Sequence, residues 1–143
     1  MTKKFYLCLF ICLIICLSVC SAQNDDKFVN ALRTCSSAYN ESDTVNVGGM
    51  TAISVKSMSG WHNSKCTYKE TLKINGQNIT TTCSFTKPQV NELISVADAY
   101  YLTLKYGGEK PDTSSLDAVK NNPFLNVMRK YLQDPSVCSM VGL

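Results

Sequence analysis

The dipeptide Asn75-Gly76 constrains the fold of this chain more than any other feature, because it is the strongest short signal for a two-residue β-hairpin turn. A two-residue loop sets Ile74 opposite Gln77, and that pairing fixes the register of the runs on both sides. In this register most apolar side chains share one face: Cys66, Tyr68, Leu72, Ile74, Ile79, Cys83 and Phe85. The opposite face carries only Lys, Thr, Asn and Ser. We therefore expect one face of the hairpin to be buried in the core and the other to be exposed to solvent.

The eight cysteines fall into two groups of four. Cys8, Cys12, Cys16 and Cys20 lie in the apolar N-terminal run, whereas Cys35, Cys66, Cys83 and Cys138 are spread over the rest of the chain. An even number in an exported chain indicates two disulfides, for which three pairings exist. Cys66 and Cys83 lie diagonally in the predicted register, which is usually too far for a bond, so we favour Cys35–Cys66 and Cys83–Cys138. A metal site is the weaker alternative, because no C-x-x-C spacing occurs and the chain has one histidine.

The N-terminus has the pattern of a secretory signal peptide. Lys3 and Lys4 precede an apolar run that ends at Cys20, and small residues then allow cleavage before Gln23. An uncleaved anchor and a lipoprotein modified at Cys20 are the alternatives, although Val19 is the wrong residue before a lipidated cysteine. We expect residues 1–22 to be removed and residues 23–143 to form a single domain that is secreted or periplasmic, with no membrane association after cleavage.

The rest of the chain predicts an α+β fold. An apolar stripe indicates a helix from Asp25 to about Tyr39, residues 40–49 read as a polar loop, and residues 51–57 alternate like a strand. Residues 57–65 read as a loop that leads into the hairpin. The expected fold is therefore an N-terminal helix, a three-stranded antiparallel meander, and two or three C-terminal helices, joined by two disulfides.

The C-terminal helices have clear start and stop signals. Thr86 and Gln89 form a capping box with Pro88 in the first turn, and an apolar stripe runs from Val90 until the glycine pair at 107–108. A short helix is expected near residues 114–119, and Pro123 begins a last one. Cys138 is expected to hold the tail.

The charge balance and the missing sequence motifs argue against several functions. Without Lys3 and Lys4, 12 basic residues face 11 acidic ones, so nothing favours nucleic acid as a partner. The chain has no nucleophile-elbow, zinc-protease, phosphate-loop or dinucleotide motif, and its one histidine, His62, lies in a polar loop. We therefore expect no enzyme activity and no cofactor. Glu70 is the one acid on the core face of the hairpin, and we expect it near a wet sheet edge or, alternatively, in a functional cleft.

Three aromatic residues are candidates for contact with a partner. Trp61, the only tryptophan, is either a core anchor or a contact residue, since tryptophan often carries the binding energy of interfaces. Tyr100 and Tyr106 cluster near one helix end and could join it. Asn40 and Asn78 begin N-x-Ser/Thr sequons at positions expected to be exposed, so both are candidate glycosylation sites.

The segment Gly60-Trp61, Lys65-Cys66-Thr67-Tyr68 and Cys83-Ser84-Phe85-Thr86-Lys87-Pro88-Gln89 resembles a pattern in small exported bacterial proteins of uncharacterised function. That resemblance implies no activity. A helix beside an antiparallel sheet also invites comparison with cystatin-like inhibitors, although their Gln-x-Val-x-Gly motif is missing. The leading hypothesis is a non-enzymatic module that binds a protein or surface ligand. An inhibitor of an extracellular hydrolase, acting through residues 57–65, and a small carboxylate-based hydrolase are the alternatives.

Overall fold

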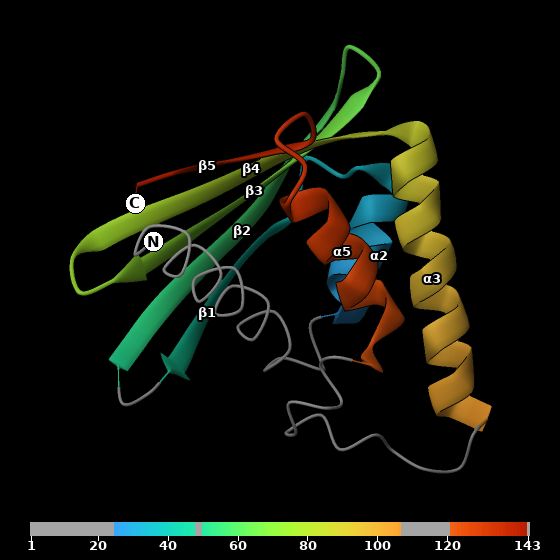
Figure 1. Cartoon of the computed structure of the whole chain (residues 1–143), viewed down its shortest axis with the longest axis horizontal. Helices are drawn as coiled ribbons and strands as arrows, with labels where there is room; N and C mark the ends of the chain where they lie inside the picture. The colour runs from blue at the N-terminus through green and yellow to red at the C-terminus, as the bar shows by residue number, and fades with distance from the viewer. Residues whose placement is uncertain (1–24, 48–49, 107–120, 143) are drawn as a thin grey trace.

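The computed structural model describes residues 25–47, 50–106 and 121–142, and the predicted signal peptide and the predicted helix near residues 114–119 lie outside them. The elements in chain order are α2 (Asp25–Thr34), β1 (Asn40–Val47), β2 (Met50–His62), β3 (Lys65–Ile74), β4 (Gln77–Thr86), α3 (Lys87–Tyr106), α5 (Pro123–Leu132) and β5 (Cys138–Val141). The strands form one antiparallel sheet in the order β1-β2-β3-β4-β5 (Figure 1).

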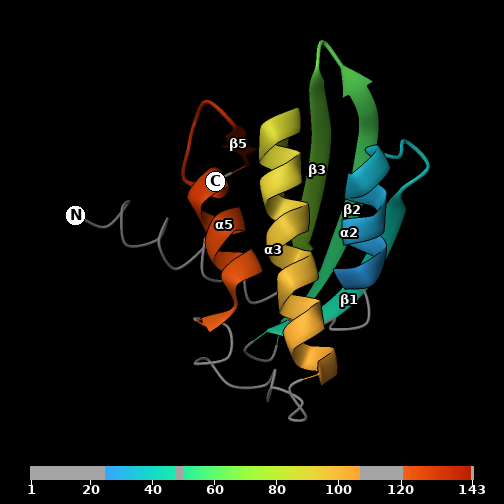
Figure 2. The same cartoon turned by 90° about the vertical axis from the view of Figure 1, so that its right-hand side faces the viewer.

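The three helices lie side by side over one face of the sheet, and the strands extend past them (Figures 1 and 2). The core lies between these two layers. Phe28 of α2 packs edge-on against the rings of Tyr39, Tyr68 and Phe124, with ring centroids 5.1–6.2 Å apart. Phe85, which is fully buried, contacts Tyr131 of α5 in the same way. We call the face under the helices the inner face and the opposite face the outer face.

The predicted register of the central hairpin is confirmed. Ile74 pairs with Gln77, Tyr68 with Cys83 and Cys66 with Phe85, with Asn75 and Gly76 both at positive φ in the turn. Six of the seven predicted apolar inner residues are buried, and Ile74 is half-buried. The dipeptide and the alternation therefore specified the same pairing independently.

The α+β class is confirmed, but the expected three-stranded meander is wrong, because the sheet has five strands. The first missed strand is β1, predicted as a loop on account of its polar sequence. Two of its four inner positions carry Glu41 and Asp43, which lie 3.4 Å from the Lys27 ammonium and 3.6 Å from the Lys56 ammonium, respectively. These acids occupy positions where an apolar residue would have signalled a strand. Charges that point inward on an edge strand also discourage pairing with other chains.

Three further expectations about the elements are wrong. β2 continues through the predicted 57–65 loop to His62, and the tail adds β5, which pairs with residues 80–83 of β4. Four residues are too few for a visible alternation. Helix α2 ends at Thr34 instead of near Tyr39, because Cys35 takes a positive φ of 48°.

The predicted helix starts are observed. The Thr86 backbone N–H donates to the Gln89 side chain at 2.8 Å, as in a capping box. The Asn122 side chain accepts hydrogen bonds from the Phe124 and Leu125 N–H groups at the start of α5. These caps fix the first turns of the two helices that cover the C-terminal half of the sheet.

Candidate partner-binding site at the β2–β3 hairpin

A β-bulge near the end of β2 decides which way Trp61 faces. Met58 pairs with Tyr68, but Trp61, three residues further on, pairs with Cys66 only two residues away, so β2 has one extra residue. The extra residue shifts the register and keeps Trp61 on the inner side, above the core. Without the bulge, Gly60 would pair with Cys66, and Trp61 would face the outer side.

The bulge and the turn both depend on unusual backbone angles. Gly60 has a φ of 83°, and the turn residues Asn63 and Ser64 have φ values of 50° and 63°. Two successive positive values give the turn geometry that matches the twist of a tight hairpin. Figure 1 shows this turn projecting past the start of α3. The end of the hairpin is therefore narrow and set by local geometry.

We expect Gly60→Ala to lower the free energy of unfolding by about 1–2 kcal/mol, because a Cβ is disfavoured at positive φ. The nearest atoms to such a Cβ are 3.7 Å away, so strain and not a clash is the cause. Urea unfolding measures the change. The matched control is Ser59→Ala, an exposed neighbour. Equal stability of Gly60→Ala and wild type would contradict the bulge geometry.

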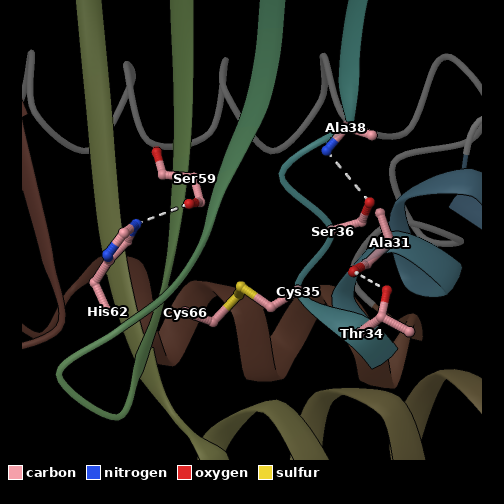
Figure 3. The surroundings of a disulfide bond; sticks show 8 residues. All are labelled: Ala31, Thr34, Cys35, Ser36, Ala38, Ser59, His62 and Cys66. Atoms are coloured by element: carbon pink, nitrogen blue, oxygen red, sulfur yellow. Dashed lines mark hydrogen bonds between the residues drawn. A yellow bond between two sulfur atoms is a disulfide. The ribbon is translucent and has the colours of Figure 1, made fainter.

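The Cys35–Cys66 disulfide fastens the turn end of this hairpin to the residue that follows α2 (Figure 3). The second disulfide joins Cys83 to Cys138 and ties β5 to β4. This is the pairing favoured from the sequence. His62 lies near the first bond in the figure, with its Nε2 atom 3.0 Å from the Ser59 carbonyl oxygen. The hairpin end is thus held by a covalent bond, a hydrogen bond and the strand ladder.

Trp61 is 39% exposed, which places it between the two expectations of a core anchor and a contact residue. Part of the ring is available to a partner while the remainder is covered. His62 and Lys65, which pair across the turn, are both exposed on the outer side. We define these three residues as the hairpin site.

The structure does not bring the other two aromatic candidates to this site. α3 begins directly after Thr86, whose partner is Lys65, so its start adjoins the hairpin. Tyr106 is its last residue, and 20 helical residues span about 30 Å. Tyr106 is 76% exposed and Tyr100 is half-buried, with its ring 6.2 Å from that of Tyr101. The predicted aromatic residues therefore lie at two separate places.

Glu70 lies on the central strand and is 6% exposed, so the expectation of a wet sheet edge is wrong. It accepts hydrogen bonds from the Ser54 hydroxyl at 2.7 Å and the Tyr68 hydroxyl at 3.1 Å. Lys56 on β2 is also buried, and in the strand register it lies opposite Glu70 on β3 and opposite Glu41 on β1. A lateral row of alternating charge, Glu41–Lys56–Glu70, therefore crosses the inner face.

The row has a repeated element that the sequence analysis missed. Tyr39-Asn-Glu41 and Tyr68-Lys-Glu70 place a tyrosine two residues before an acid on β1 and β3, and each hydroxyl donates to its own acid. Burial, together with these neighbouring carboxylates, raises the pKa of Tyr39 and of Tyr68 well above the ordinary value. The two tyrosines therefore remain protonated donors above the pH at which an exposed tyrosine ionises. The Y-x-E spacing is visible in the sequence, but only the register shows that both acids flank Lys56.

We expect the folded protein to resist ionisation of Tyr39 and Tyr68 above pH 10. Because their folded pKa values are raised, their contribution to stability is present below pH 10 and is lost as the pH rises further, when the unfolded state ionises first. Absorbance titration should show the phenolates of Tyr39 and Tyr68 appearing only on unfolding, after that of Tyr131, whose pKa burial and Glu92 raise to about 12. The Tyr39→Phe, Tyr68→Phe double variant should lack this late step. Ionisation of every tyrosine near pH 10 in the folded protein would contradict the network.

Both sequon asparagines, Asn40 and Asn78, are exposed at outer positions of the sheet. Among residues 25–47, 50–106 and 121–142, no group of three or more His, Cys, Asp or Glu residues is arranged to hold a metal ion. No helix in the described part of the chain is long and apolar enough to cross a membrane.

The resemblance to small exported bacterial proteins stays a prediction. No protein-family model, curated protein or solved structure matches the chain.

Proposed function

We propose that the chain is an exported, non-enzymatic binding module that contacts a protein partner through the hairpin site. The observation that supports this most is a half-covered Trp61 at the end of a narrow hairpin fastened by a disulfide. Export is proposed from the N-terminal sequence and is supported by the two disulfides, which form in oxidising compartments.

The geometry suits binding for an energetic reason. A tryptophan ring buries a large apolar area while immobilising only two side-chain torsions. Here the backbone is fixed beforehand by the bulge at Gly60, by the turn and by Cys35–Cys66, so association costs little further ordering. His62 and Lys65 add exposed polar groups on the outer side of the same hairpin end.

An inhibitor of an extracellular hydrolase is the second candidate, and the projecting hairpin favours it. A narrow, rigid wedge can enter a concave enzyme site, whereas a flat surface cannot. The carboxylate-based hydrolase gains no comparable support. Glu41 and Asp43 are in ion pairs, and the Glu70 carboxylate is buried and hydrogen-bonded to Ser54 and Tyr68.

We expect Trp61→Ala to weaken capture of the partner by about 2 kcal/mol or more, or roughly 30-fold, because a central tryptophan often carries that much binding energy. The loss of stability should be smaller, about 1–2 kcal/mol, since the ring is 39% exposed. Affinity capture by the tagged full chain after export, from the fluid that surrounds the producing cells, measures binding. Thermal melting measures stability.

Tyr106→Ala is the matched control, because it removes a more exposed ring at the far end of α3. It should leave capture unchanged. Equal capture by wild type and Trp61→Ala would contradict the proposal, as would a loss of 3–5 kcal/mol of stability in Trp61→Ala, which is the cost of a core cavity. A captured hydrolase whose activity falls on binding would identify the module as an inhibitor.

A further inference from the structure

The outer face of the sheet carries positive charge only. Alternation along β3 places Lys65, Lys69 and Lys73 outward, and all three are exposed. The three acids of the described strands, Glu41, Asp43 and Glu70, all lie at inner positions. No outward position of these strands carries an acid. The near-neutral composition therefore hides a one-sided distribution of charge.

The three lysines also differ from most other described basic residues in having no ion pair to the described acids. Lys27, Arg33, Lys56 and Lys130 each pair with an acid elsewhere in the structure. The described acid side chains near the inner face and the helices are engaged by these partners, by Ser54 and Tyr68, by Tyr131 or by Ser136. Lys65, Lys69 and Lys73 remain available to an external anion.

We propose that this face, the β3 lysine row, binds an anionic polysaccharide. Successive lysines are four residues apart, or about 13 Å along an extended strand, which suits a polymer with repeated charges better than a single small anion. Outward hydroxyls surround the row: Thr67 and Thr71 on β3, and Thr80, Thr82 and Ser84 on β4. Ammonium groups and hydroxyls together match a ligand that presents acidic groups and hydroxyls.

The same face is less suited to other polyanions. No outward position of the described strands carries Phe, Tyr or Trp, on which the bases of a single-stranded nucleic acid would stack. Next to β3, only Ile53 and Val55 of β2 offer aliphatic surface, which is little for the apolar centre of a protein interface. The lysine row shares Lys65 with the hairpin site, but it does not involve Trp61, which lies on the inner side.

The test is titration of the exported protein, produced in a host that adds no N-glycans, because Asn78 pairs with Lys73 and a glycan there would cover the row. The probes are dextran sulfate and polygalacturonate, which distinguish sulfated from carboxylated polymers, with neutral dextran as the blank. We expect binding to at least one charged polymer, and affinity that falls steeply with added salt. The Lys69→Gln, Lys73→Gln double variant should bind roughly tenfold or more weakly.

Lys87→Gln, Lys130→Gln is the matched control, since it removes the same charge from the helices. It should bind as wild type does, and Trp61→Ala should as well, which separates this result from the proposed function. Failure of both charged polymers to bind at low salt, or equal weakening by the two double variants, would overturn the proposal. Tighter binding to a DNA duplex or to anionic phospholipid vesicles at the same salt would overturn the choice of a polysaccharide.

Discussion

Lys56→Met should lower the free energy of unfolding by about 3–5 kcal/mol, because it removes the cation from a buried row of charges. Lys56 is 7% exposed, and its ammonium lies 3.6 Å from the Asp43 carboxylate. In the strand register its neighbours are Glu41 on β1 and Glu70 on β3. Glu70 would stay buried, and Glu41 and Asp43 partly buried, without the compensating charge. Urea unfolding at neutral pH measures the change.

Lys73→Met is the matched control for that variant. It makes the same substitution on the neighbouring strand, but at an exposed outer position, and should change stability by about 0.5 kcal/mol or less. A Lys56→Met variant as stable as this control would show that the row contributes nothing to stability. Compensation by Lys56 would then no longer explain why the acids of β1 can face inward.

Replacing both Cys83 and Cys138 by Ala should cost about 4 kcal/mol. The bond closes a 55-residue span, and in the chain-entropy account a longer loop gains more from closure. Because β5 pairs with only four residues of β4, it depends on this bond for its position. Calorimetric melting measures the loss, and hydrogen exchange should show the β5 amides losing protection first.

The Cys35→Ala, Cys66→Ala variant provides the comparison. Its span is 31 residues, so the expected loss is slightly smaller, about 3.5 kcal/mol. A cost below about 1 kcal/mol for the Cys83 and Cys138 pair, with β5 still protected, would contradict the dependence of β5 on its disulfide.

The central hairpin could be predicted because its turn chemistry and its alternation agree. β1 could not, because sequence periodicity reports apolar residues, and two of the four inner positions of β1 carry the acids Glu41 and Asp43. Glu41 and Asp43 become acceptable inside only when Lys27 of α2 and Lys56 of β2 are brought beside them, and that depends on tertiary structure. The helix caps were predicted because a cap is set within four residues.

The candidate site, like the fold, could be predicted from the sequence only in part. The sequence singled out Trp61 and the 57–65 region, but the bulge at Gly60 that orients the ring has no signature beyond a glycine in a strand-like run. The separation of Trp61 from Tyr106 follows from the length and direction of α3, which residue types do not reveal. The outward lysine row could be read from the alternation of β3, yet its lack of acidic neighbours depends on which way β1 faces.

The fluorescence of Trp61 in the complex tests the central claim most directly, because Trp61 is the only tryptophan of the chain and reports on the hairpin site alone. A captured partner whose own tryptophans are replaced, or a peptide of it that lacks tryptophan, keeps the signal specific. In the free protein, the 39% exposed ring should be quenched by acrylamide. Saturating partner should shift its emission to shorter wavelength and protect it from the quencher. Unchanged emission and quenching at saturation would contradict binding through the hairpin site.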